Sequence, residues 1–301
     1  MRVAVTGAAG RLGSALVTRL AGPAPGGAHE VLGWTRAEFD LDDPGPVVQR
    51  IVAARPDLVI HAAAWTDVDG CAREPELAMR RNGEATSILA RACAEAGVSM
   101  ILVSTNEVFD GARLDGKGYG TADPVNPPNP YGASKLAGEQ GAAAAFEEVR
   151  AGGGTDQPSV GIVRTSWLFG AGKPDFPARI AAAARAATTE GRALRLVNDE
   201  FGSPTYVPDL ADAIARLAEA GFSGIHHVVN VGVATRADWA HDVLDRLGIA
   251  ANIEEISLAD YPRPSRPPRW GVLEPTPLPG GPLRSWRDAM ADRVAVADFA
   301  P

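Results

Sequence analysis

The sequence predicts an α/β protein built on a Rossmann-type doubly wound parallel sheet, with a smaller C-terminal α/β lobe. The first observation is a glycine-rich turn near the start of the chain, between an apolar run that favours a strand and an apolar helical pattern. The second is the repeated alternation of expected strands and helices, which demands right-handed crossovers between parallel strands. The third is a pair of nearly continuous apolar runs, residues 57–63 and 98–104, typical of strands buried on both faces.

The first half of the chain supplies most of the expected sheet. Its strands are expected at residues 3–5, 30–34, 57–63, 98–104 and 159–164. One helix follows the glycine turn, and residues 22–27 form a loop after it. Further helices are expected at 44–54, 74–96 and 129–147. Pro130 favours a helix start, because the first turn does not need its missing N–H.

The second half is less regular. Helices are expected at 174–190, 207–220, 236–247 and 283–294, and strands at 193–197 and 226–231. The proline-rich segment 261–270 is expected to be irregular. We therefore expect a dinucleotide-binding domain over residues 1–165, to which the chain returns around 205–231. Residues 166–301 are expected to form mainly the substrate-binding lobe.

The glycine turn indicates a dinucleotide site. Gly7, Gly10 and Gly13 permit a sharp turn, contact between backbone and a pyrophosphate, and close packing of helix on strand. The following helix presents free amide groups and its positive dipole end to phosphates. The alternative is a plain glycine-rich turn. The flanking strand and helix favour the dinucleotide site.

Arg36 follows the second expected strand, where such a fold distinguishes its cofactors. An acid at this point holds the ribose 2′-hydroxyl of NAD, whereas an arginine accommodates the 2′-phosphate of NADP. Positions 34–36 contain no acid and do contain Arg36. We therefore expect NADPH, with NADH as the second choice. A solvated surface arginine is the alternative explanation.

Composition narrows the class of protein. The 301 residues include 29 basic and 37 acidic side chains, a net charge of −8, which argues against nucleic acid as the main partner. No apolar run approaches a membrane span, and a strand at the very start leaves no room for a signal peptide. Cys71 and Cys93 make neither a disulfide framework nor a metal set. We expect a soluble cytoplasmic protein with no metal site and no membrane or nucleic-acid partner.

Tyr131, Lys135 and Thr105 form the strongest chemical pattern. Tyr131 and Lys135 lie four residues apart on an expected helix and so project from one face. A free tyrosine has a pKa near ~10, and an adjacent ammonium can lower it by roughly 1–3. The phenol would then suit general acid catalysis on a carbonyl, with the Thr105 hydroxyl orienting the same oxygen. A chance Tyr-x-x-x-Lys spacing and a capping threonine are the alternatives.

These motifs resemble the extended short-chain dehydrogenase/reductase superfamily. Longer segments resemble one branch of it, the dTDP-4-dehydrorhamnose reductases. They lie at residues 62–69, 74–82, 104–111, 127–139, 164–170 and 199–205, so the resemblance covers nearly the whole chain.

The resemblance implies a role for each matching residue. The catalytic residues would be Thr105, Tyr131 and Lys135. The cofactor would contact Gly7, Gly10, Arg11, Leu12, Gly13, Arg36, Asp40, Leu41, Ala62, Ala63 and Ala64, together with Tyr131 and Lys135. Asp40 and Leu41 would lie near the adenine. The sugar nucleotide would contact Thr66, Val68, Asn106, Glu107, Trp167 and Arg269.

Some positions depart from the family pattern. Asn106-Glu107 stands where the family usually has Asp-Tyr, which leaves the identity of the sugar open. Some relatives bind magnesium through an acid early in the first helix, whereas Ser14-Ala15-Leu16 has none. Arg263, Arg266 and Arg269 lie where relatives complete the substrate pocket, and arginine suits a diphosphate. A solvated proline-rich loop is the alternative.

The resemblance implies that NADPH reduces the C4 keto group of a nucleotide-bound 4-keto-6-deoxyhexose, with Tyr131 as the proton donor. A sugar-nucleotide epimerase or dehydratase shares the three catalytic residues, and Glu107 keeps that alternative open. A non-catalytic subunit resembling the regulatory β subunit of methionine adenosyltransferase is the third possibility. A homodimer also stays open.

Overall fold

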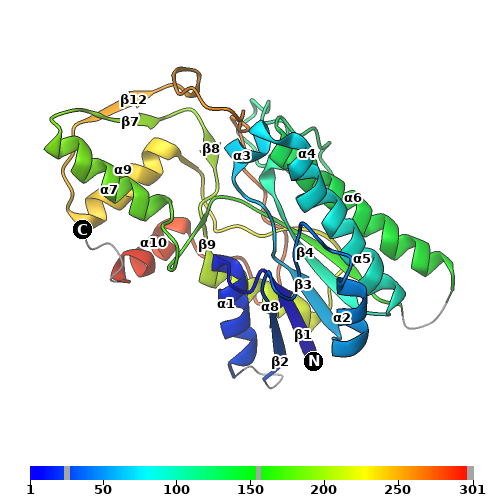
Figure 1. Ribbon diagram of the computed structural model, residues 1–301. Helices are drawn as coiled ribbons and strands as arrows, with labels where there is room; N and C mark the ends of the chain where they lie inside the picture. The colour runs from blue at the N-terminus through cyan, green and yellow to red at the C-terminus, as the bar shows by residue number, and fades with distance from the viewer. Residues whose placement is uncertain (24–27, 154–156, 297–301) are drawn as a thin grey trace.

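The computed structural model describes residues 1–23, 28–153 and 157–296, so most of the expected loop at 22–27 lies outside the described residues (Figure 1). Its centre is a parallel six-stranded sheet in the order β10-β5-β4-β3-β1-β2. The strands are β1 (Arg2–Thr6), β2 (Glu30–Trp34), β3 (Leu58–His61), β4 (Ser99–Thr105), β5 (Val160–Thr165) and β10 (Gly224–His227). The expected Rossmann-type sheet is confirmed. Its strand order reverses between β1 and β3, where such sheets form a ligand crevice.

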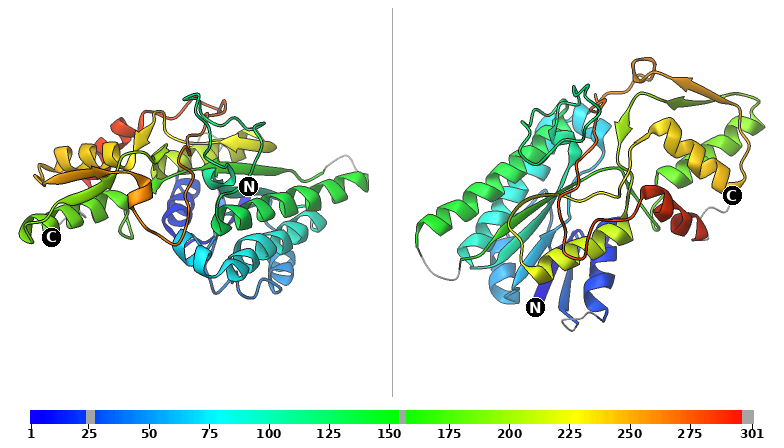
Figure 2. Two further views of the ribbon diagram at one scale, coloured as in Figure 1. Left: turned by 90° about the horizontal axis from the view of Figure 1, so that it is seen from above. Right: turned by 180° about the vertical axis from the view of Figure 1, so that it is seen from behind.

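Helices cover both faces of this sheet (Figures 1 and 2). One face packs against α1 (Arg11–Ala21) and α8 (Val207–Ala220), and the other against α2 (Val47–Ala54), α5 (Ala85–Glu95) and α6 (Pro130–Ala151). The alternation within β1 sets this arrangement, because Val3 and Val5 enter the first core and Ala4 enters the second. Side chains on both faces are therefore apolar.

The smaller lobe lies beside the carboxyl edge of the sheet (Figure 1). It contains α7 (Phe176–Thr189), α9 (Arg236–Leu247) and α10 (Trp286–Ala295), with β7 (Leu194–Val197) and β12 (Ile253–Ile256) paired in parallel. Two further short pairs join β6 (Leu168–Phe169) to β9 (Thr205–Tyr206) and β8 (Phe201–Gly202) to β11 (Ala234–Thr235). Trp239 and Trp286 fill an aromatic core there.

Several expected elements differ in detail. The helix expected at 74–96 consists of α4 (Pro75–Ala78), a π-helical segment (Met79–Glu84) and α5, because residues 79–84 adopt wider i→i+5 turns. The strand expected at 226–231 ends at His227. A short helix, α3 (Val68–Arg73), and β12 were not predicted. Asp67 caps α3 through its side chain, which accepts a hydrogen bond from the Gly70 amide.

Candidate active site

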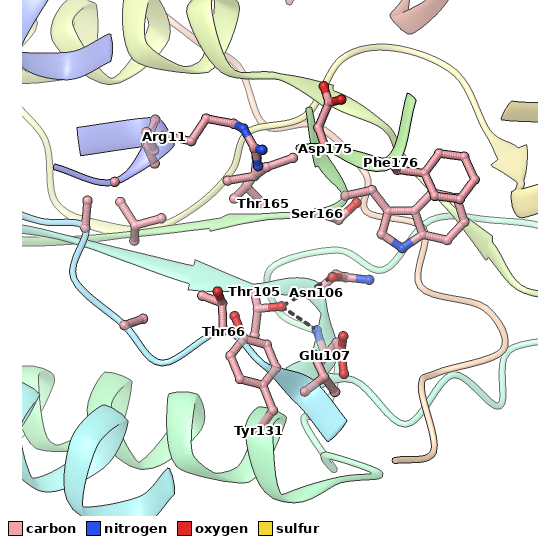
Figure 3. Close-up of a pocket in the computed structure, with 18 of the residues that line it drawn as sticks. Arg11, Thr66, Thr105, Asn106, Glu107, Tyr131, Thr165, Ser166, Asp175 and Phe176 are labelled. Carbon is pink, nitrogen blue, oxygen red and sulfur yellow. Dashed lines mark hydrogen bonds between the residues drawn. The ribbon is translucent and has the colours of Figure 1, made fainter. Parts of the chain in front are cut away.

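A pocket of about 590 Å³ lies between the carboxyl edge of the sheet and the smaller lobe. Its lining comes from the N-termini of α1 and α6, the ends of β4 and β5, and the lobe helices α7 and α9. Figure 3 shows Tyr131, Thr105 and Glu107 on one side, with Arg11, Ser166 and Phe176 across from them. Segments far apart in the sequence thus converge at the edge where this fold binds ligands.

The glycine turn forms one end of the pocket. Gly7 has a φ of +67°, and a Cβ there would lie 2.9 Å from the backbone of Ala63. A Cβ on Gly13 would lie 2.1 Å from the Gly7 carbonyl oxygen. Among the described residues, no side chain caps the first turn of α1, whose early amides lack intrahelical partners. The turn therefore fits a pyrophosphate placed against backbone N–H groups.

The predicted cofactor residues are only partly brought together at the pocket. The pocket lining includes Gly10, Arg11, Leu12, Gly13, Ala62 and Ala64, and Gly7 and Ala63 pack directly behind it. The lining does not include Arg36, Asp40 and Leu41, which follow β2 in the chain. The Arg36 guanidinium is exposed, with Nε 3.0 Å from an Asp40 oxygen and Nη2 2.8 Å from an Asp42 oxygen. Two carboxylates therefore already balance its charge.

Lys135 is buried under the pocket wall. Its side chain projects from α6, and Nζ donates to the carbonyl oxygen of Val103 on β4 over 2.8 Å. Only 3% of the residue is exposed. Burial lowers the pKa of Lys135 to about 8, although the Glu139 carboxylate one turn later opposes this change. Near neutral pH the Lys135 side chain can therefore be either a charged ammonium or a neutral amine.

The phenol of Tyr131 corrects one prediction. We expected Lys135 to lower the pKa of Tyr131, but that pKa is raised. Burial is the main cause, and the negative charge of Glu107 adds to it, while the hydrogen bond shared with Thr105 acts in the opposite direction. The Lys135 ammonium instead contacts the Val103 carbonyl. Tyr131 therefore holds its proton at neutral pH, as a proton donor must.

Thr105 lies at the last position of β4, as predicted. Its Oγ1 accepts from the Glu107 backbone N–H at 3.2 Å and donates to Asn106 Oδ1 at 3.3 Å. Asn106 is buried, and its Nδ2 donates to the Gly271 carbonyl oxygen at 2.9 Å. A carboxylate at 106 could not donate to the Gly271 carbonyl, so this departure from the family pattern joins Thr105 to the C-terminal segment.

Two buried asparagines hold elements that line the pocket, and the sequence had assigned a role to neither of them. Asn129 caps α6 through Oδ1, which accepts from the Gly132 amide at 2.9 Å. Asn82, in the π-helical segment, bonds both the backbone N–H and the carbonyl of Trp65, at 2.8 and 3.0 Å. These bonds fix the start of the helix that carries Tyr131 and the loop after β3. The Asn-Pro pair at 129–130 was a readable capping signal.

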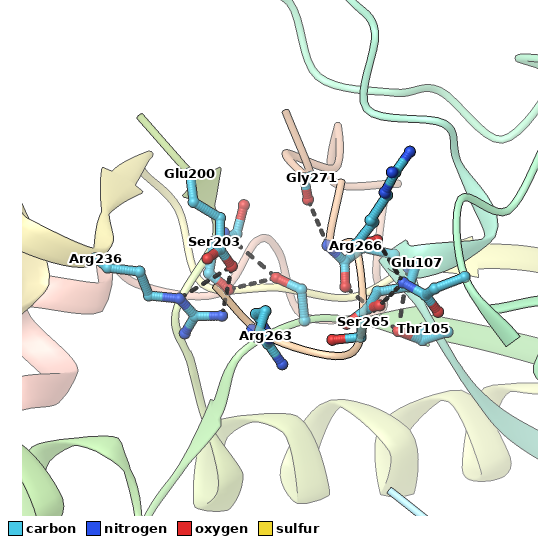
Figure 4. A network of polar contacts seen from close by, with 12 residues as sticks. Thr105, Glu107, Glu200, Ser203, Arg236, Arg263, Ser265, Arg266 and Gly271 are labelled. Carbon is cyan, nitrogen blue, oxygen red and sulfur yellow. Dashed lines mark hydrogen bonds and ion pairs between the residues drawn. The ribbon is translucent and has the colours of Figure 1, made fainter. Parts of the chain in front are cut away.

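Glu107 belongs to a polar network (Figure 4). Asn129 Nδ2 lies 2.6 Å from its Oε2 and 3.0 Å from the Arg266 carbonyl oxygen. Burial raises the pKa of Glu107 to about 7, against the effect of the Asn129 hydrogen bond, and the Glu200 carboxylate raises it further. Arg236 and Arg263 act weakly in the opposite sense. A carboxyl group beside Thr105 can thus exchange protons near neutrality.

The predicted substrate residues divide into two groups. Thr66, Val68, Asn106, Glu107 and Trp167 all line the pocket. Thr66 lies on the loop after β3, and Val68 is the first residue of α3. Arg269 is exposed outside the lining, with Nε 3.3 Å from the Asp199 carbonyl oxygen. Nothing in its contacts brings it to the pocket.

Trp167 joins the two parts of the molecule. Its ring stacks on Trp239 with centroids 5.7 Å apart, and the Arg236 guanidinium lies 3.6 Å above it. Its φ of +45° is strained for a bulky residue, and Gly202 leaves room for the ring. Sequence reasoning also missed three cationic residues of the lining, which are Lys173, Arg179 and Arg236. These residues reach the pocket through the packing of the smaller lobe against the sheet, which no local sequence motif indicates.

No group of three His, Cys, Asp or Glu side chains that could hold a metal ion occurs in residues 1–23, 28–153 and 157–296. None of the helices in that part of the chain has the length and apolar character that a membrane span requires.

Comparison with known proteins adds independent evidence. The model of the family described as RmlD substrate binding domain matches residues 1–298. A dTDP-4-dehydrorhamnose reductase of Mycobacterium tuberculosis is 38% identical, covering 98% of this chain and 92% of the relative. A protein of the same name from Streptomyces griseus is 36% identical, covering 96% of this chain and 91% of the relative.

Solved structures agree with the sequence relatives. A dTDP-4-dehydrorhamnose reductase from Clostridium acetobutylicum superposes with a TM-score of 0.86 at 27% identity, covering 98% of this chain and 99% of the other. One from Bacillus anthracis, in complex with NADP, gives 0.84 at 27%, covering 98% of each chain. A UDP-glucose 4-epimerase from Thermus thermophilus, at 24% identity and 0.71, covers 99% of this chain and 96% of the other and shares the fold.

Proposed function

Since this chain belongs to the dTDP-4-dehydrorhamnose reductase family of oxidoreductases, we propose that it reduces the C4 keto group of a nucleotide-linked 4-keto-6-deoxyhexose with NADPH. The observation that carries the proposal is the convergence of Tyr131, Thr105 and the glycine turn on one pocket. NADPH, with NADH as a weaker alternative, would supply the hydride. The glycine turn and Lys135 are the groups that would hold it.

The chain's own residues supply the proton and the orientation. Tyr131 keeps its proton at neutral pH because it is buried, so it can protonate the oxygen of the reduced carbonyl. Thr105 shares a hydrogen bond with that phenol and is itself held by the Glu107 amide. If the Thr105 hydroxyl turns from Asn106 Oδ1 to the bound carbonyl, two donors would stabilise the charge that develops on that oxygen. The buried wall limits competing proton transfer from water.

The remaining lining suits a sugar nucleotide. Val68 and Trp167 offer apolar surface for a C6 methyl group, and the Thr66 hydroxyl can bond a sugar hydroxyl. Lys173, Arg179 and Arg236 line the lobe side of the pocket and suit a diphosphate. We retain Arg269 as an outer contact for the nucleotide, which its exposed position permits. A homodimer remains a proposal as well.

The alternative activities have less support. The relatives from Mycobacterium tuberculosis and Streptomyces griseus, 38% and 36% identical over nearly the whole chain, carry reductase names, whereas the epimerase likeness supports the fold alone. A non-catalytic regulatory subunit would not need the buried Tyr131, Thr105 and Lys135 group.

The direct test is an NADPH oxidation assay with a small panel of dTDP-4-keto-6-deoxyhexoses, with the product identified by NMR. We expect NADPH consumption that depends on the keto sugar, and none with dTDP-glucose, which has no keto group. Failure to consume NADPH with any member of the panel would refute the proposal.

A further inference from the structure

The pocket contains a carboxyl group that the proposed reduction does not use. Glu107 and Asp175 are the two acidic residues of the lining in the part of the chain that the structure describes. Asp175 is fully engaged, because its carboxylate pairs with Arg293 at 2.7 Å and accepts from the amides of Gly170 and Ala178. Glu107 is held only through Oε2, by Asn129 at 2.6 Å. Within the described chain, its Oε1 has no hydrogen-bond partner.

The position of Glu107 relative to the reacting groups is fixed by its backbone. Its N–H donates to Thr105 Oγ1 at 3.2 Å, so the residue cannot move away without releasing the catalytic hydroxyl. Its carboxyl group lines the same pocket as Tyr131 and Thr105, and its negative charge raises the pKa of the Tyr131 phenol. Figure 3 shows the three side chains on the same side of the pocket. If Tyr131 and Thr105 held the carbonyl oxygen of a bound ketone, its α carbon atoms would lie on the same side of the pocket as Glu107.

The neighbouring cations do not neutralise Glu107. Arg236 pairs with Glu200 at 2.8 Å, and Arg263 pairs with Asp69 at 3.0 Å. Burial and the nearby Glu200 carboxylate raise the pKa of Glu107 to about 7, against the hydrogen bond from Asn129. The group can therefore accept a proton and return it at neutral pH.

On the basis of the proposed function, we propose that Glu107 is a general base that reversibly removes a proton from a carbon α to the keto group of the bound sugar. The chain would then exchange that hydrogen with solvent in addition to reducing the ketone. The C–H bond breaks, its electron pair forms the C=C bond of an enolate, and the proton passes to the Glu107 carboxylate. Tyr131 and Thr105 hydrogen-bond the enolate oxygen. Return of a solvent-derived proton regenerates the ketone, so the step needs no oxidant or reductant.

The same donors serve both reactions for a simple reason. A hydrogen bond to the carbonyl oxygen favours hydride addition at the carbonyl carbon, and it equally stabilises the enolate formed by loss of an α proton. A base on the same wall then decides whether the second reaction occurs. Glu107 occupies a position where the family pattern has tyrosine, so the exchange would be a property of this chain.

The experiment uses the full chain with NADP⁺, so that no hydride is available, and a dTDP-4-keto-6-deoxyhexose dissolved in D₂O. Loss of the α-proton signals is followed by ¹H NMR, with the enzyme-free rate subtracted. Reduction of the same sugar with NADPH is measured first. We expect wild-type exchange above background, and a fall of roughly 10²–10⁴-fold in Glu107→Gln, the range for loss of a general base. Reduction should fall by a smaller factor.

Controls separate a lost base from a damaged site. NADP⁺ affinity and the melting temperature of Glu107→Gln show whether the variant folds, and Glu107→Asp, which keeps a carboxylate, should retain more exchange than Gln. A wild-type chain that reduces the sugar without exchanging its α hydrogens would overturn this inference and leave the proposed function intact. Exchange that persists in Glu107→Gln would also overturn it. Absence of reduction across the sugar panel would refute the proposed function instead.

Discussion

The ammonium of Lys135 donates to the main-chain carbonyl of Val103 over 2.8 Å and so joins α6 to β4 beneath the pocket. The bond holds the helix that carries Tyr131 against the strand that ends in Thr105. Burying the ammonium also has a cost, because desolvation disfavours the charged form and lowers the pKa of Lys135 to about 8. The buried Lys135 ammonium therefore holds α6 in position but lowers the stability of the folded state.

Lys135→Met should stabilise the fold at pH 7 and abolish turnover. The folded-state pKa of about 8 lies below the ordinary lysine value of 10.5, so the buried charge destabilises the native state below pH 8. This cost declines as the pH rises from 8 to 10.5, because the native lysine is then neutral. We expect a gain of about 1–3 kcal/mol in unfolding free energy at pH 7, shrinking by pH 10. Urea denaturation at both pH values measures it, with the exposed Lys117→Met as the control.

A second prediction concerns the alkaline limb of the pH–rate profile. The Tyr131 pKa is raised, so loss of the phenol proton cannot limit activity near pH 8. Lys135 loses its proton there, and kcat/KM should fall as the pH rises through about 8. Lys135→Arg should move the limb to higher pH, because a guanidinium stays charged. If the alkaline limb kept its position in Lys135→Arg, the group that titrates there would be a residue other than Lys135.

Tyr131→Phe should reduce kcat by at least roughly 10²-fold, the scale of a lost general acid. Cofactor affinity should change little, because the glycine turn and Lys135 remain. Tyr119→Phe is a matched control, since Tyr119 is buried but its hydroxyl bonds Asp110 outside the pocket. That variant should lose stability and keep turnover. A Tyr131→Phe enzyme with most of its activity would show that the proton comes from elsewhere.

The sequence predicted best those elements that carry local signals. The bounds expected for α8 and α9 match the structure, because α9 begins with a capping box at Thr235 and Asp238 and ends at Gly248 in the left-handed conformation. The pairing of β7 with β12 could not be predicted, since each strand is short and its partner lies far along the chain.

The candidate site could likewise be predicted where local motifs define it, and could not be predicted where it depends on contacts between distant segments. The motifs placed Thr105 and Tyr131 at a strand end and a helix start, where the structure also has them. The expected lowering of the Tyr131 pKa was wrong, because it assumed that Lys135 faces the phenol. Whether a side chain four residues away faces the phenol or a neighbouring strand depends on tertiary packing. The approach of Arg236 to the pocket depends on packing in the same way.

Arg36→Ala should lower the preference for NADPH over NADH by less than about tenfold. The guanidinium is largely exposed and already paired with Asp40 and Asp42, so a 2′-phosphate would have to compete with two carboxylates. Salt should weaken the preference further. The ratio of kcat/KM for the two cofactors measures the effect. Arg91→Ala, which removes an exposed arginine paired with Glu148 on another helix, is the control. An identical ratio in Arg36→Ala and wild type would make Arg36 a surface charge only.

Trp167→Ala should weaken sugar-nucleotide binding by roughly 1–3 kcal/mol, the scale of a lost aromatic contact in a pocket. The ring lines the pocket, but it also stacks on Trp239 and lies beneath the Arg236 guanidinium. The variant should therefore lose stability as well, by about 2–4 kcal/mol, since a large cavity would open between the stacked groups.

The two effects of Trp167→Ala are separated by a variant from the same aromatic core. Trp286 is fully buried in that core and does not line the pocket. Trp286→Phe should lower the melting temperature while leaving the sugar nucleotide bound with nearly wild-type affinity. Isothermal titration of NADPH and of the sugar nucleotide into both variants, well below their melting temperatures, gives the comparison. If Trp167→Ala weakened both ligands equally, the residue would act by packing the lobes together, and its place in the sugar pocket would be lost.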